Sequence, residues 1–191
     1  MIPLALNPNR AELALVGAGA PALRRLRALR RGGAVRLAVY APEAGEALAA
    51  EAGGDLRGFL PGEAEISRFH ALWIAGLSPA EFVPLAEAAR RARVLVNVED
   101  EPEYCDFHAV AELRRGDLLL TVSTGGGAPG LAGTIRRNLE TCFPPNWEER
   151  VAEIAALRQG WRAENLPMAE AARRIDNIVE ERCWLPCPKP D

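Results

Sequence analysis

The chain has 191 residues, of which 49% are hydrophobic and 26% are charged, and its formal net charge is −3. This balance predicts a soluble globular protein that can bury a core without disulfides. The acidic charge argues against a nucleic-acid-binding protein, because phosphate neutralisation needs a basic surface. Residues 1–6 resemble no secretion leader, and no apolar stretch approaches a membrane span. We therefore expect a cytoplasmic protein that makes no use of a membrane.

Short apolar runs alternate with amphipathic segments through the first hundred residues. Strands are expected over 12–16, 34–40, 56–59, 70–75 and 94–98. Helices are expected from residue 22 and over 43–52 and 80–93. This alternation with short connections predicts an α/β fold, in which a mostly parallel Rossmann-like sheet carries helices on both faces.

The regular alternation ends near residue 113. A further strand is expected over 117–123, followed by helices over 131–140, 147–161 and 168–181. The pattern therefore divides the chain into a dinucleotide-binding domain at 1–113, a short region at 114–145 and a helical part at 146–191.

A glycine turn joins the first expected strand to the first expected helix. Gly17 permits a tight turn, Gly19 lets the backbone approach a pyrophosphate, and Ala22 allows close helix packing. The free N–H groups and dipole of the helix N-terminus would hold the anion. A tight turn without a ligand remains an alternative. The predicted cofactor-binding residues here are Gly17, Ala18, Gly19, Ala20, Pro21 and Ala22.

The second strand of such a fold commonly ends at an acid that binds the ribose hydroxyls. Here it ends at Ala41 and Pro42, and the nearest acid is Glu43. We therefore add these three residues to the predicted cofactor site. The sequence does not decide between NAD and NADP. The lack of a basic residue at this strand end favours NAD.

Polar residues follow directly on the fifth apolar strand. Asn97 and Asp100 are expected at the carboxyl edge of the sheet, where ligands bind in open α/β folds. Asp100 is the predicted catalytic acid or base, because a desolvated carboxylate can exchange a proton with substrate near neutral pH. A helix-capping role before Glu101 and Pro102 is equally compatible with the sequence.

A second glycine loop precedes the helix expected at 131–140. Backbone amides of such a loop can bind anionic groups. We predict substrate-binding residues at Ser123, Thr124, Gly125 and Gly126, together with Asn97.

The cysteines and histidines predict no metal site. Cys183 and Cys187 are close, but structural zinc needs four convergent ligands. His108 near Asp106 is more consistent with a packed or solvated side chain than with a ligand.

In this order, these segments resemble the precorrin-2 dehydrogenase and sirohydrochlorin ferrochelatase family, the N-terminal module of siroheme synthases. The likeness covers most of residues 1–140, including Arg24 and Arg25 where the family has Arg-Lys. The residues that carry it are Pro3–Asn7, Leu15–Gly19, Ala22, Gly33, Ala34, Val39–Pro42, Asn97–Asp100, Phe107, Ser123–Ala132 and Arg136.

The resemblance implies NAD-dependent oxidation of precorrin-2 to sirohydrochlorin, with Asp100 at the position of the family's key aspartate. Some members also insert ferrous iron. It further implies an anionic tetrapyrrole substrate, to which Arg side chains are suited, and a homodimer whose dimerisation region is 114–145.

The chain departs from the family pattern at several positions, among them Val110 in place of a proline, Ala128 in place of a small polar residue, and a segment near the nicotinamide side. Residues 74–78 lack the threonine and the following polar residue that the family usually has there. The alternative function is therefore a divergent tetrapyrrole-binding or pathway-partner protein that keeps the fold without hydride transfer.

Overall fold

The computed structural model describes residues 2–185. It contains two compact units, one that ends at Ala109 and one that begins at Val110. The domain boundary expected after residue 113 falls inside a strand of the second unit, Ala111–Arg115 (β6).

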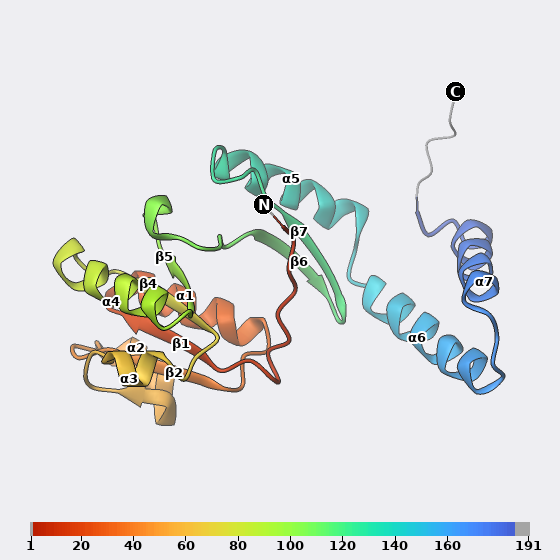
Figure 1. Ribbon diagram of the computed structural model, residues 1–191. Helices are drawn as coiled ribbons and strands as arrows, with labels where there is room; N and C mark the ends of the chain where they lie inside the picture. Colours follow the sequence, from red (N-terminus) through yellow and green to blue (C-terminus); the bar gives the residue numbers. More distant parts are fainter. Residues whose placement is uncertain (1, 186–191) are drawn as a thin grey trace. The chain divides into compact units, whose positions relative to one another are not determined.

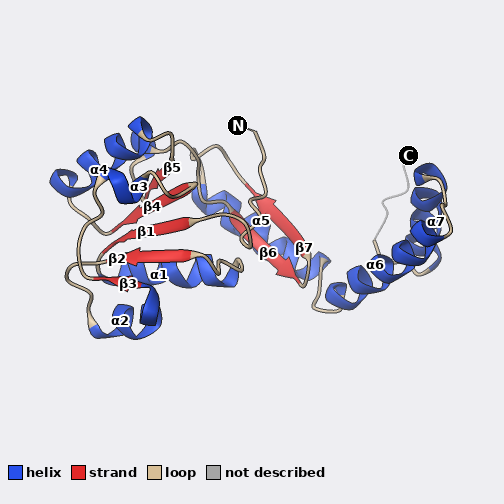
Figure 2. Cartoon of the chain, turned by 60° about the horizontal axis from the view of Figure 1, so that its bottom comes forward, coloured by secondary structure: helices blue, strands red, loops and turns tan. Residues whose placement is uncertain are grey.

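The first unit is built on a five-stranded sheet in the order β3-β2-β1-β4-β5, and every neighbouring pair is parallel. Figures 1 and 2 show these strands side by side. The predicted Rossmann-like sheet is confirmed. The strands are β1 (Leu13–Gly17), β2 (Leu37–Tyr40), β3 (Leu56–Arg57), β4 (Ala71–Ala75) and β5 (Leu95–Val98).

Helices cover both faces of this sheet, so β1 is buried along its whole length. Side chains alternate between the faces. Val16 and Val96 belong to a cluster with helix α4, whereas Leu15 belongs to a cluster with helices α1 and α2. The helices are α1 (Gly19–Arg31), α2 (Glu46–Ala52), α3 (Glu63–Ile66) and α4 (Pro79–Arg91).

Two local differences from the expected elements are informative. The helix expected from Glu43 begins at Glu46, because residues 42–45 form a loop that ends at the N-cap residue Gly45. Helix α3 was not expected, since its four residues are too few to show a helical period.

The second unit contains a β-hairpin and three helices. Strand β6 pairs antiparallel with β7 (Leu118–Val122), and Gly116 has a φ of 55° in the turn between them. Strand β6 was not expected, because only Leu113 of its five residues is buried and three are charged. The helices are α5 (Pro129–Cys142), α6 (Trp147–Ala163) and α7 (Met168–Glu181). Among the described helices of both units, none has the length and apolarity needed to cross a bilayer.

Candidate active site

The glycine turn joins the ends of β1 and β4. The Ala18 N–H donates a hydrogen bond to the Ala75 carbonyl oxygen at 3.1 Å. A Cβ on Gly17 would lie 2.1 Å from that oxygen and 3.0 Å from the Ala22 Cβ. Only glycine fits at residue 17, and the small Ala22 side chain allows α1 to begin close to the sheet.

The N-terminus of α1 is open to an anion. Gly19 has a φ of 62°, and the first turn has neither a side-chain cap nor an acidic residue. The N–H groups of Gly19 and Ala20 have no acceptor within the helix, because the first turn of an α-helix leaves its donors free. Pro21 lacks an N–H. The turn therefore fits the pyrophosphate of a dinucleotide through two backbone donors and the helix dipole.

The end of β2 carries the expected ribose-binding segment and an arginine that the sequence interpretation missed. Ala41 is buried and its N–H donates to the Arg57 carbonyl oxygen at 2.9 Å. Pro42 and Glu43 are exposed in the loop that follows. Arg57 is the register partner of Tyr40, and its guanidinium donates to the Gly54 and Leu56 carbonyl oxygens at 2.9 Å. Arg57 lies at the end of β2 because β3 pairs with β2, and this pairing is not evident from the sequence.

Asp100 lies in the turn that follows β5. The Glu101 N–H donates to the Val98 carbonyl oxygen at 3.2 Å and closes the turn. Asp100 is exposed and has a φ of 66°, a left-handed conformation that Asp and Asn tolerate better than most residues. The short 3-10 helix at Pro102–Tyr104 (η2) has Glu101 at its N-cap position and no side-chain cap. Asp100 therefore does not occupy the cap position of η2, and no hydrogen bond or ion pair joins its carboxylate to another described residue.

Asn97 is buried within β5, and its amide is already engaged. Its Nδ2 donates to the Phe107 carbonyl oxygen at 2.9 Å and lies 3.3 Å from the Cys105 Sγ. These contacts hold the 105–107 segment through the Asn97 Nδ2. Substrate binding by Asn97 stays a prediction.

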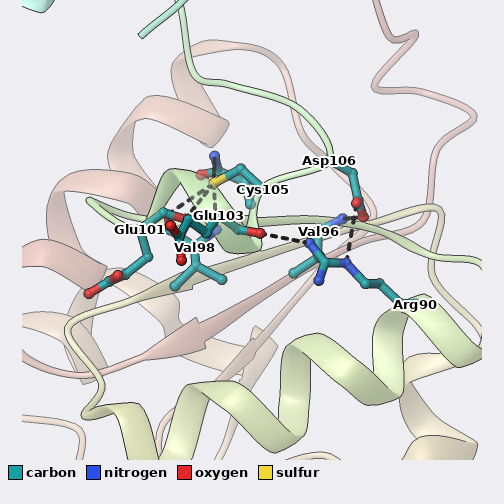
Figure 3. A network of polar contacts seen from close by, with 8 residues as sticks. Arg90, Val96, Val98, Glu101, Glu103, Cys105 and Asp106 are labelled. Carbon is teal, nitrogen blue, oxygen red and sulfur yellow. Dashed lines mark hydrogen bonds and ion pairs between the residues drawn. The ribbon is translucent and has the colours of Figure 1, made fainter. Parts of the chain in front are cut away.

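A polar network around Cys105 joins Val98 to Glu101 (Figure 3). These two residues flank Glu99 and Asp100 in the sequence. The Cys105 Sγ lies 3.2 Å from the Val98 carbonyl oxygen and 3.3 Å from that of Glu101, so the thiol spans the turn. The Val98 N–H also donates to the sulfur at 3.3 Å. Burial is the main cause that raises the pKa of the Cys105 thiol. The thiol is therefore a protonated donor near neutral pH.

Asp106 closes the outer edge of β5 beside this thiol. Its N–H donates to the Val96 carbonyl oxygen at 2.8 Å, and its Oδ2 accepts the Val96 N–H at 3.1 Å. Arg90 of α4 donates to Oδ1 at 3.4 Å. An exposed strand edge is prone to wrong pairing, because its backbone N–H and C=O groups lack partners. Asp106 provides partners for both backbone groups of Val96 at this edge. The contacts could not be read from the sequence, because they join a loop to a strand ten residues earlier.

The second glycine loop, in the other unit, contains two glycines in the left-handed conformation. Gly125 and Gly126 have φ values of 68° and 84°. The Ser123 Oγ accepts the Gly125 N–H at 3.3 Å, and the Thr124 Oγ1 accepts the Ala128 N–H at 3.2 Å. Neither hydroxyl donates to a described residue, so both hydrogens are available to an anion. The predicted substrate residues are thus divided, with Asn97 in the first unit and this loop in the second.

The histidines and cysteines form no recognisable metal centre in the described part of the chain. Across residues 2–185 no group of three His, Cys, Asp or Glu side chains is placed to hold an ion. The His70 Nδ1 accepts the Glu12 N–H at 2.9 Å, which is a structural role. Cys183 is exposed, whereas Cys187 lies outside the described residues.

Comparison with known proteins confirms the family resemblance. Residues 4–111 match the model of the family described as "Putative NAD(P)-binding". The chain is 37% identical over 169 residues to a siroheme synthase of Azotobacter vinelandii, covering 85% of this chain and 35% of that protein. It is 31% identical over 181 residues to siroheme synthase 3 of Aeromonas hydrophila, covering 93% of this chain and 38% of that protein.

A solved structure shares the fold over almost the whole chain. The protein described as SirC, precorrin-2 dehydrogenase, is 20% identical, with a TM-score of 0.76 over 99% of this chain and 94% of that one. By contrast, the chain spans little more than a third of the length of the two siroheme synthases.

Proposed function

Because the chain belongs to the family described as "Putative NAD(P)-binding", we propose that it binds a nicotinamide dinucleotide at the Gly17–Ala22 turn. We propose further that it catalyses the NAD-dependent oxidation of precorrin-2 to sirohydrochlorin. One observation carries the proposal: the open glycine turn and the free Asp100 carboxylate follow parallel strands of one sheet, β1 and β5, at the same edge. The names of the similar proteins support the substrate class.

Each residue has a distinct role in this reaction. The Gly19 and Ala20 N–H groups bind the pyrophosphate, and Glu43 is the candidate partner of the ribose hydroxyls. The bound cofactor would supply a hydride acceptor at its nicotinamide ring. Asp100 accepts the proton that the substrate loses as the hydride leaves. One hydride and one proton together account for the two-electron oxidation of the substrate.

We propose NAD rather than NADP as the cofactor. Glu43, in the loop after β2, suits ribose hydroxyls and would repel a 2′-phosphate. Arg57 is the register partner of Tyr40 at this strand end, and its guanidinium donates to two backbone carbonyls. Titration of the chain with each dinucleotide tests this choice. Tighter binding of NADP would overturn it and would identify Arg57 as a phosphate ligand.

We propose that the chain acts as a homodimer in the cytoplasm, where NAD is abundant. The second unit supports self-association through α5, on which Leu131 is 54% exposed and Ile135 is 39% exposed. These residues are four positions apart and lie on one face of the helix. Sedimentation velocity would measure the mass in solution, and a monomer at micromolar concentration would contradict this part of the proposal.

The decisive experiment is anaerobic turnover of enzymatically generated precorrin-2 with NAD, followed by sirohydrochlorin absorbance and by NADH absorbance. We expect both signals to rise together in equal molar amounts. NAD binding without turnover would reject the dehydrogenase. Calorimetry with NAD alone separates a failure of cofactor binding from a failure of catalysis.

A second function is a tetrapyrrole-binding protein that has lost hydride transfer. Gly76, at the end of β4, favours it, because a Cβ there would lie 2.4 Å from the Ala18 carbonyl oxygen. This position therefore cannot present a polar side chain to a nicotinamide. Binding of a tetrapyrrole in the absence of any NAD binding would support this second function over the first.

A further inference from the structure

Two arginines of α1 and one glutamate form a charged cluster beside Asp100. The Glu99 Oε1 lies 3.7 Å from the Arg24 guanidinium and 4.0 Å from that of Arg25. Glu99 is held in place by its backbone, since its N–H donates to the Ile74 carbonyl oxygen at 2.9 Å. Asn97 and Glu99 lie two residues apart along the strand direction, so their side chains share the face of the sheet that α1 covers.

The cluster is only partly satisfied. The Arg25 Nε and the Glu99 Oε2 are buried and have no hydrogen-bond partner. The two ion-pair distances also exceed the 2.7–2.9 Å that is typical of a direct charged hydrogen bond. Buried polar atoms are normally paired, and an exception is a frequent mark of function. A single carboxylate therefore serves two guanidinium groups, and neither group is fully engaged.

Exposure separates the roles of the two arginines. The side chain of Arg25 is 16% exposed and that of Glu99 is 20% exposed, so both form the inner part of the cluster. The side chain of Arg24 is 65% exposed. Its guanidinium has one loose ion pair with Glu99 and otherwise offers its donors to solvent. Arg24 can therefore receive an anion without displacing the inner pair.

The position of the cluster in the sheet indicates which ligand it meets. Strand β5 lies on the opposite side of β1 from β2. In this fold the adenosine ribose binds at the end of the second strand. The cluster is therefore on the half of the carboxyl edge away from the ribose, next to the predicted catalytic carboxylate.

We propose that Arg24 binds a carboxylate of the substrate, while Glu99 and Arg25 position its guanidinium at the edge of the sheet. This inference rests on the proposed function and adds to it a specific contact for a polycarboxylate macrocycle. Arginine suits this task because its planar fork can donate two parallel hydrogen bonds to one carboxylate. The ion pair with Glu99 limits the rotamers of the Arg24 side chain, so Arg24 loses less side-chain entropy when it binds the carboxylate.

The test compares Arg24→Gln with Arg31→Gln, a matched control in the last turn of the same helix. Arg31 forms no ion pair with any described residue. The probe is uroporphyrin, a porphyrin with carboxylates on every pyrrole, whose binding is followed by fluorescence. We expect Arg24→Gln to weaken binding about 10- to 100-fold, the effect of losing a charged hydrogen bond. Arg31→Gln should bind as the wild type does, and NAD affinity should be unchanged in both.

Two further variants test the positioning role. Arg24→Lys keeps the charge without the fork, so it should restore part of the lost affinity. Glu99→Gln should raise the KM for precorrin-2 while largely preserving kcat, because it loosens Arg24 without removing it.

The outcomes separate this inference from the proposed function. If Arg24→Gln binds uroporphyrin as tightly as the control does, the inference is overturned and the proposed function stands. If the wild-type chain binds NAD but no uroporphyrin, the inference fails together with the proposed substrate class. If Arg24→Gln weakens NAD to the same degree as uroporphyrin, Arg24 is a cofactor ligand and the inference is also overturned.

Discussion

Gly17 passes so close to Ala75 that an added Cβ on the glycine would lie 2.1 Å from the Ala75 carbonyl oxygen. The same oxygen accepts the Ala18 N–H at 3.1 Å. The turn is therefore anchored by backbone atoms of β4, which leaves the N–H groups at the start of α1 free for a ligand. A rigid turn with free donors is what pyrophosphate binding requires.

Substitution of Gly17 by alanine should damage both the fold and cofactor binding. The obstacle is a backbone oxygen, which cannot move without disturbing the sheet, so we expect a loss of about 1–3 kcal/mol in the free energy of unfolding. Urea denaturation and NAD calorimetry measure the two effects. Gly45→Ala is the matched control, since a Cβ at Gly45 meets no atom within 4 Å. Equal stability of the two variants would disprove the close approach.

Asp100→Asn should strongly reduce turnover while leaving the fold intact. Asparagine tolerates the φ of 66° at this position but cannot act as a base. We expect kcat to fall about 10²- to 10⁴-fold, the usual contribution of a general base. NAD affinity and the melting temperature should match those of the wild type.

Asp100→Ala provides a contrast that separates chemistry from backbone strain. Alanine is less favourable in the left-handed region, so this variant should lose about 1 kcal/mol of stability relative to Asp100→Asn. Thermal denaturation measures the difference. An asparagine variant with undiminished turnover would remove Asp100 from the mechanism.

Cys105 should react slowly with thiol reagents. The thiolate is the reactive form, and burial raises the pKa of this thiol, which lowers the thiolate fraction at a given pH. Cys142 is exposed and serves as the internal control. Peptide mass spectrometry after timed iodoacetamide treatment at pH 8 should show Cys105 labelled at least about tenfold more slowly. Comparable rates would mean that the loop around Asp100 opens readily.

Ser78 and Glu81 should make the start of α4 sensitive to acid. The Ser78 N–H and Oγ donate to the Glu81 Oε2 at 2.8 and 2.6 Å, and the hydrogen bond from the Ser78 side chain is the main cause that lowers the pKa of Glu81. A lowered carboxyl pKa adds stability above the unfolded-state pKa, and this contribution is lost as the pH falls through the folded-state value.

The measurement for this cap is the melting temperature of Glu81→Gln against pH. The variant should melt below the wild type at pH 7, and the difference should shrink toward pH 3 as Glu81 becomes protonated. Glu87→Gln, an exposed position on the same helix, should match the wild type at pH 7. A difference that stayed constant with pH would show that the carboxylate charge does not stabilise the cap.

The sequence by itself determined the Rossmann-like sheet, the glycine turn and the placement of Asp100 after β5. These features are local, because each depends on residues that are neighbours in the sequence. They are the alternation of apolar runs, the requirement for glycine at Gly17 and Gly19, and the end of a strand. The family resemblance also followed from short segments in a fixed order. It was confirmed by the relatives, which are siroheme synthases.

Only the tertiary structure decided what surrounds the reactive carboxylate. Glu99 meets Arg24 and Arg25 across about 75 residues of chain, because β5 and α1 are brought together by the order of the strands. The commitment of the Asn97 amide to the Phe107 carbonyl and the position of Arg57 beside Tyr40 arise in the same way. The type of a residue and its position in the sequence determine which bonds it can form. Strand pairing and helix packing determine which partner it contacts.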